Sequence, residues 1–122
     1  MPKSKVSFET VREIARQFPD VEETTTWGAP TLKVRGQLLA CVPTNRSAEP
    51  DSLVLRIDFP DRAALLEENP AAFYLPDHYA GYTSVLVRPS QVDKAALRDL
   101  LGVAYKFVTR LKPSTSRPRK RR

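Results

Sequence analysis

The chain has 122 residues, of which 41% are hydrophobic and 28% charged, a composition typical of one small globular domain and not of an extended disordered protein. Lysine and arginine total 20 against 14 acidic residues, so the formal net charge is +6. This excess lies in the last residues, because residues 1–111 contain 14 basic and 14 acidic side chains. We therefore predict a neutral domain over residues 1–111 and a disordered basic tail over residues 112–122.

Cysteine content and hydropathy exclude two further classes of protein. Cys41 is the single cysteine and cannot form an internal disulfide, which excludes a secreted disulfide-rich scaffold. No stretch approaches the roughly 20 apolar residues that span a bilayer, and the N-terminus lacks the apolar core of a signal peptide. We expect a cytoplasmic protein that does not contact membranes, and we assume a monomer.

Hydrophobic periodicity predicts alternating helical and extended segments. Apolar residues from Phe8 to Phe18 recur at helical spacing, Ser7 can cap this helix, and Pro19 ends it. Gly36 separates two segments of period two, in a turn whose type the sequence leaves open. In chain order we predict a helix over 8–18, an additional short strand over 24–27 that breaks at 28–30, strands over 31–35 and 37–42, a loop over 43–52, a strand over 52–58, a short helix over 60–69, a turn-rich aromatic segment over 73–82, a strand over 83–88 and a long helix from 91 or 93 to 111.

This order of elements predicts the fold class. The connections between neighbouring strands are mostly short, which favours antiparallel pairing over parallel crossovers. The amphipathic helices need a sheet face against which to bury their apolar sides. We therefore predict an α+β fold with two layers, in which helices pack on one face of a largely antiparallel sheet.

The sequence contains no recognisable catalytic or metal-binding motif. His78 is the single histidine, and neither Ser84 nor Cys41 lies in a known nucleophile motif. No second histidine or cysteine completes a metal site with His78 and Asp77, and the four glycines are too far apart for a phosphate-binding loop. We predict a protein that is not an enzyme, with no catalytic residue, metal or cofactor, and His78 hydrogen-bonded within an aromatic turn.

Cations on the strands are the candidate binding residues. Strand parity places Lys33, Arg35 and Arg56 on polar sides of strands and Arg88 at a strand end, so these four could gather on a sheet face that contacts phosphates. The aromatic residues Trp27, Tyr79 and Tyr82 could stack on unpaired bases. Two alternatives stay open. Asp58 has the parity of Arg56 and could neutralise the cluster, and Trp27 could belong to the core.

The tail is the second candidate. It could track phosphates as a flexible arm, or it could be a solubilising terminus with incidental affinity for polyanions. Its six cations are Lys112, Arg117, Arg119, Lys120, Arg121 and Arg122.

Several segments together resemble the MmcQ/YjbR family of small bacterial proteins. They are residues 18–23 (FPDVEE), 27–36 (WGAPTLKVRG), 53–56 (LVLR), 73–82 (FYLPDHYAGY) and 85–88 (VLVR). The resemblance spans about residues 7–111 and implies a CyaY-like fold with a DNA-binding role through a double-wing arrangement of hairpins. It implies no catalytic residue. Residues that could occupy the wings are Lys33, Arg35 and Gly36 in the first hairpin and Arg56 and Arg88 on neighbouring strands.

Two main functional hypotheses result from the sequence, and an enzyme of unknown type is a third. The first is DNA binding of low sequence specificity, mostly to the phosphate backbone, through the strand cations and the basic tail. The alternative is a protein-interaction or small-ligand module that uses the aromatic segment Tyr74–Tyr82. Its candidate pocket surrounds His78 and consists of Trp27, Tyr74, Asp77, His78, Tyr79 and Tyr82.

Overall fold

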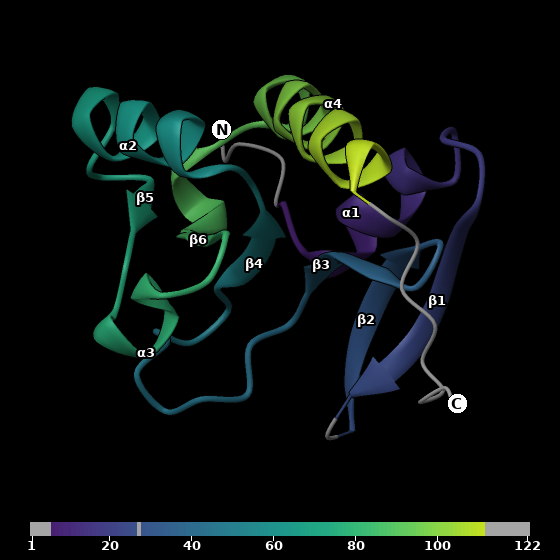
Figure 1. Cartoon of the computed structure of the whole chain (residues 1–122). Coiled ribbons are helices and arrows are strands. Elements are labelled where there is room, and N and C mark those ends of the chain that lie inside the picture. The colour runs from purple at the N-terminus through teal and green to yellow at the C-terminus, as the bar shows by residue number, and fades with distance from the viewer. Residues whose placement is uncertain (1–5, 27, 112–122) are drawn as a thin grey trace, which may run out of the picture.

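The computed structural model describes residues 6–26 and 28–111 (Figure 1). Its elements are α1 (Phe8–Ala15), β1 (Val21–Thr26), β2 (Ala29–Val34), β3 (Gln37–Cys41), β4 (Leu53–Arg56), α2 (Phe59–Glu68), β5 (Phe73–Tyr74), α3 (Asp77–Ala80), β6 (Ser84–Val87), the 3-10 turn η1 (Pro89–Gln91) and α4 (Lys94–Arg110). The six strands form one sheet in the order β1-β2-β3-β4-β6-β5, and every neighbouring pair is antiparallel. The predicted α+β class with an antiparallel sheet is confirmed.

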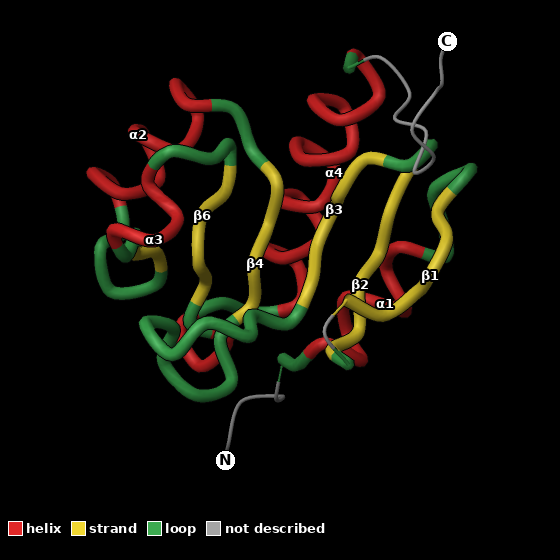
Figure 2. The backbone as a smooth tube through the Cα atoms, turned by 60° about the horizontal axis from the view of Figure 1, so that its bottom comes forward, coloured by secondary structure: helices red, strands yellow, loops and turns green. Residues whose placement is uncertain are grey.

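Helices α1 and α4 form the layer that buries the core. They lie behind the sheet in Figure 2, where α4 crosses β2, β3 and β4 and also contacts α1. Ile14 on α1, Leu55 on β4 and Leu101 on α4 are at most 1% exposed and belong to one hydrophobic cluster. Each such side chain stabilises the fold by about 1.5–3 kcal/mol through its removal from water.

The opposite face of the sheet is partly covered. On β4 and β6, Val54 and Leu86 alternate with the core residues and so point away from α4, yet both are buried. Helix α3 contacts β6 and lies beside it in Figure 2, and its residues His78 and Tyr79 border a hollow together with Val54 on this side. No helix packs on this face over β1, β2 and β3, so the described chain leaves that part of the sheet open.

Acidic and hydroxyl side chains set the helix starts, as expected from their capping chemistry. Ser7 and Thr10 form a capping box at α1, and Asp93 accepts a 2.8 Å hydrogen bond from the Ala96 amide at α4. Asp58 accepts from the Phe59 amide at 2.8 Å and caps α2. The alternative that Asp58 neutralises Arg56 is not observed, because this carboxylate caps α2 and no described carboxylate forms an ion pair with Arg56.

The first hairpin starts earlier than the sequence pattern predicts. β1 begins at Val21, and Ala29 and Pro30 belong to β2 although we expected a break there. Gly28 lies between the two strands with φ of +79°, a conformation that glycine adopts without strain. Pro30 fits the strand because the amide of Val42 donates to its carbonyl at 3.1 Å, so the pairing needs no proline N–H.

Arg35 lies in the β2–β3 turn and not on the strand as predicted. Both central residues of this two-residue turn have positive φ, +53° at Arg35 and +83° at Gly36, which is the pattern of a type I′ turn. An arginine is strained in this region of backbone conformation, whereas asparagine tolerates it well.

We expect the substitution Arg35→Asn to raise the free energy of unfolding by about 0.5–1 kcal/mol, because it relieves this strain. The exposed Arg35–Asp20 ion pair, 3.4 Å long, stabilises too little to offset the gain. Urea denaturation measures the difference. Gly36→Ala is the opposite control and should destabilise the domain, and an Arg35→Asn variant less stable than the natural chain would contradict the assignment of the turn.

Candidate nucleic-acid interface

Lys33 is the strand cation that meets the prediction best. It lies on β2, on the open face of the sheet, in register with Glu22 on β1 and Leu38 on β3. Its side chain is half-buried, and among residues 6–26 and 28–111 it makes no ion pair. Its ammonium group is therefore available to an anion.

Arg56 is held in place without a carboxylate. Its Nε donates to Thr83 Oγ1 at 2.7 Å, and its Nη1 donates to Gln37 Oε1 at 3.4 Å. The guanidinium also lies 5.8 Å from the centre of the Phe107 ring. Partial burial lowers the pKa of Arg56, but an arginine stays charged at neutral pH. Arg56 therefore presents a positioned positive charge at the end of β4.

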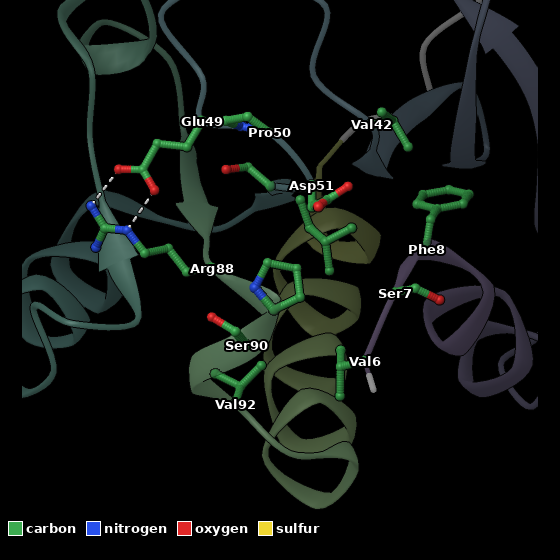
Figure 3. Close-up of a pocket in the computed structure, with 13 residues that line it drawn as sticks. Val6, Ser7, Phe8, Val42, Glu49, Pro50, Asp51, Arg88, Ser90 and Val92 are labelled. Atoms are coloured by element: carbon green, nitrogen blue, oxygen red, sulfur yellow. Dashed lines mark hydrogen bonds and ion pairs between the residues drawn. The ribbon is translucent and has the colours of Figure 1, made fainter. Parts of the chain in front are cut away.

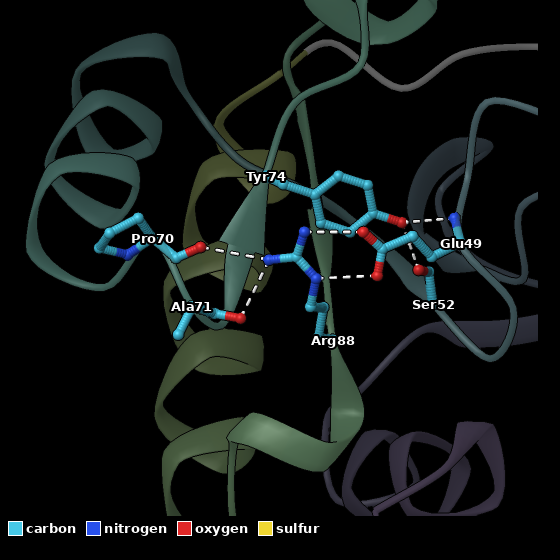
Figure 4. Close-up of polar contacts among 6 residues, drawn as sticks. All are labelled: Glu49, Ser52, Pro70, Ala71, Tyr74 and Arg88. Atoms are coloured by element: carbon cyan, nitrogen blue, oxygen red, sulfur yellow. Dashed lines mark hydrogen bonds and ion pairs between the residues drawn. The ribbon is translucent and has the colours of Figure 1, made fainter.

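Arg88 is engaged within the domain. Its Nε and Nη2 donate to the two carboxylate oxygens of Glu49 at 2.8 and 2.7 Å, and its Nη1 donates to the carbonyls of Pro70 and Ala71 at 3.2 and 3.0 Å (Figure 4). The guanidinium also stacks on Tyr74, 4.3 Å from the ring centre. The phosphate contact of Arg88 stays a prediction, and this geometry favours a structural role instead, because few N–H groups remain for a ligand.

Tyr74 extends the same cluster to the loop over residues 43–52. Its hydroxyl accepts a 2.7 Å hydrogen bond from the Glu49 amide and bonds to the hydroxyl of Ser52 (Figure 4). The guanidinium of Arg88 lowers the pKa of Glu49 below its ordinary value of 4.5, and the carboxylate raises the pKa of Arg88. The cluster therefore joins β5, β6 and the loop through charge-assisted hydrogen bonds.

The aromatic segment separates into two environments. Tyr74 belongs to the Arg88 cluster, and neither Tyr74 nor Asp77 lines the hollow that contains the other predicted residues. Trp27 lies outside the described residues. His78, Tyr79 and Tyr82 do come together, with the His78 ring 4.8 Å from that of Tyr79, edge to face, and 6.5 Å from that of Tyr82. The single six-residue pocket that we predicted is therefore wrong in part.

His78, Tyr79 and Tyr82 form the rim of a hollow of about 360 Å³, which we call the sheet-face hollow. Apolar side chains from β3 and β4 form its floor, and polar groups complete the wall. The other lining residues are Leu38, Cys41, Val54, Arg56, Thr83 and Ser84. Burial raises the pKa of the Cys41 thiol to about 11 and also raises the pKa of Tyr79, so both groups are neutral at physiological pH.

Arg62 positions the rim, a role that the sequence analysis missed. From α2 its Nη1 donates to the carbonyls of Tyr82 and Ser84 at 2.7 and 3.2 Å, and its Nη2 donates to that of Ala80 at 3.2 Å. A lone arginine on a short helix gives no signal of such contacts, because the carbonyls are about 20 residues away in the sequence. Arg62 fixes the backbone between α3 and β6 and thus the position of Tyr82.

A larger hollow of about 700 Å³ lies at the other end of the sheet (Figure 3). The residues that line it include the apolar Val6, Phe8, Val42, Leu53 and Val92 and the charged Glu49, Asp51 and Arg88. Among the described residues that line it, Glu49 and Asp51 carry carboxylates, and the one cation, Arg88, is bound to Glu49. This hollow is unsuited to a polyanion.

The described part of the chain shows no cluster of three or more residues that could ligate a metal ion. None of its helices has the length and apolar character needed to cross a membrane.

The predicted tail lies outside the described residues, but its starting point is defined. Helix α4 ends at Arg110, and Phe107 near that end lies beside Arg56. Arg56 in turn contacts Gln37, the first residue after the Arg35–Gly36 turn. Residues 112–122 therefore follow a helix that ends near the β2–β3 turn and the end of β4 (Figure 2).

Comparison with known proteins identifies the family. No curated protein matches the chain. A crystal structure of the Deinococcus radiodurans protein DR2400, described as having a DUF419 domain, matches with a TM-score of 0.68 and 22% sequence identity, over 84% of this chain and 78% of that one. At this identity the likeness shows the fold alone. The model of the YjbR family matches residues 16–107, most of the described domain. The chain therefore belongs to the YjbR family.

Proposed function

We propose that this protein binds DNA through its phosphate backbone, with low sequence specificity. The observation that carries the proposal is the placement of Lys33 and Arg56, which lie on strands of the partly open sheet and make no ion pair with any described residue. Arg35 at the neighbouring turn adds a third cation, because its pairing with Asp20 is long and exposed.

The charge distribution gives the domain and the tail different contributions to DNA binding. Residues 6–111 contain 12 basic and 14 acidic side chains, so the described domain has no general attraction for a polyanion. The three available cations supply a local site, and the six cations after residue 111 supply non-specific attraction. Because α4, which precedes the tail, ends near Arg56 and the β2–β3 turn, both parts can contact one stretch of DNA.

The substitution Lys33→Gln in the full chain should weaken duplex binding and reduce the slope of log affinity against log salt by about 0.9, the value for one lost phosphate contact. Fluorescence anisotropy with a labelled duplex at several salt concentrations measures both quantities. Lys106→Gln is the matched control. Lys106 is exposed on α4, so this substitution removes the same charge from the helical layer instead of the sheet face.

The two variants separate a site from bulk charge. If Lys33→Gln and Lys106→Gln weaken binding equally, the sheet face is not an interface and only net charge matters. If the natural chain has no measurable affinity for DNA at low salt, the proposed function is wrong.

A further inference from the structure

We propose that the sheet-face hollow binds an unpaired nucleobase, so that the protein prefers single-stranded or distorted DNA to an intact duplex. This proposal rests on the proposed DNA-binding function and adds the structure of the nucleic acid that is recognised. Three features of the hollow support it: an exposed aromatic ring, an apolar floor and a buried hydroxyl without a partner.

The ring is that of Tyr82. Its residue is 62% exposed, the largest value among the large hydrophobic residues that are described, and Arg62 holds its backbone by a 2.7 Å hydrogen bond. An exposed but positioned ring can stack on a base at low entropic cost, because its backbone is already ordered. His78 beside it adds a second aromatic surface at the rim.

The floor suits the edge and face of a flat ring. Leu38, Cys41 and Val54 line it, and the Cys41 thiol is neutral. The volume of about 360 Å³ lies near the lower end of the range of about 300–1,000 Å³ for small-molecule pockets. A base fits this space, whereas the stacked pairs of a duplex cannot reach the floor.

The hydroxyl is that of Ser84. This residue lines the hollow and is only 4% exposed, yet its side chain makes no hydrogen bond within the described ranges. A buried polar group without a partner is unfavourable, and such groups in native structures call for an explanation. A polar atom on the edge of a bound base would satisfy it.

Charge favours this hollow over the larger one. Arg56 lines the wall, and Lys33 is in register with Leu38 of the floor, so two cations lie near the phosphates of an inserted nucleotide. The larger hollow instead carries Glu49 and Asp51 at its border, which would repel the backbone. The two sites therefore differ in the sign of the charge that they accept.

The test compares a fluorescein-labelled oligothymidine with a duplex of the same length, using the full chain. We expect tighter binding of the single strand, and we expect Tyr82→Ala to weaken it by about 5- to 150-fold, the range measured for loss of one stacked base. Duplex affinity should stay unchanged. Tyr82→Phe is the control, because it keeps the ring and should keep the single-strand affinity.

Ser84→Ala gives an independent second arm. Removal of a hydroxyl without a partner should leave the thermal midpoint unchanged or higher, while it lowers single-strand affinity. A purely structural role would instead lower the midpoint and leave the affinity unchanged.

The outcomes separate the two proposals. If Tyr82→Ala and Ser84→Ala leave the single-strand affinity unchanged while Lys33→Gln lowers it, the base site is wrong and DNA binding stands. Equal affinity of the natural chain for the single strand and the duplex would also overturn the base site. Absence of binding to both probes would overturn DNA binding itself.

Discussion

Deletion of residues 112–122 is expected to weaken duplex binding strongly and to remove most of its salt dependence. The six cations in this segment would release counterions from the DNA, which corresponds to a slope of about −5 in log affinity against log salt. Between about 50 and 200 mM salt, such a slope changes the affinity about 10³-fold. The domain that remains has no net positive charge, so it cannot replace this contribution.

Anisotropy titrations of the full chain and of residues 1–111 against one duplex measure both quantities. The control is a chain in which the six cations of the tail are replaced by glutamine, because it keeps the length of the tail and removes only the charge. It should behave like the deletion. An unchanged slope after the deletion would show that the tail is a solubilising terminus and that any affinity belongs to the domain.

Loss of the Glu49–Arg88 pair is expected to lower the thermal midpoint at neutral pH by several degrees, on the order of 5 °C. The substitution Arg88→Met removes four hydrogen bonds and leaves the Glu49 carboxylate without its partner. The loop over residues 43–52 then loses its attachment to β6. Circular dichroism followed against temperature measures the midpoint.

This stabilisation should also depend on pH in a defined direction. Arg88 lowers the pKa of Glu49 in the folded state below its ordinary value of 4.5. A carboxyl group with a lowered folded-state pKa stabilises the protein above its unfolded-state pKa and loses this effect as the pH falls through the folded-state value. The difference in midpoint between the natural chain and Glu49→Gln should therefore be full at neutral pH and shrink below about pH 4.5.

Lys94→Gln serves as the control for the pH dependence, because its ion pair with Glu13 is exposed and 3.5 Å long. An exposed pair of this kind stabilises little at any pH. A difference for Glu49→Gln that stays constant from neutral to acidic pH would show that the carboxylate charge is not what holds the loop.

The helices and the sheet class could be predicted from the sequence because their signals are local. Ser7 and Asp93 cap helices near the expected positions, and the alternation in Leu53, Val54 and Leu55 identifies a strand. The first hairpin is less predictable, because a proline such as Pro30 ordinarily ends a strand. The fit of this proline depends on a hydrogen bond from Val42, which no local pattern contains.

The candidate site is less predictable, because the sequence shows which residues are charged but not which of them form ion pairs in the folded domain. Arg88 and Arg56 both follow apolar strands, and in the sequence they are equivalent candidates for phosphate binding. The fold places Glu49, which is 39 residues away, against Arg88 and no carboxylate against Arg56. Periodicity also could not separate Tyr74 from Tyr82, although one lies under a guanidinium and the other is exposed.

The net charge of +6 shows the same division between sequence and structure. The sequence by itself determined that this charge follows residue 111, that the rest is neutral, and that an α+β domain forms, because composition and periodicity are properties of neighbouring residues. The tertiary structure alone decided which cations are available and that His78, Tyr79 and Tyr82 surround one hollow. Ion pairs and pockets join residues that are distant in the chain, so only the packing of the sheet determines them.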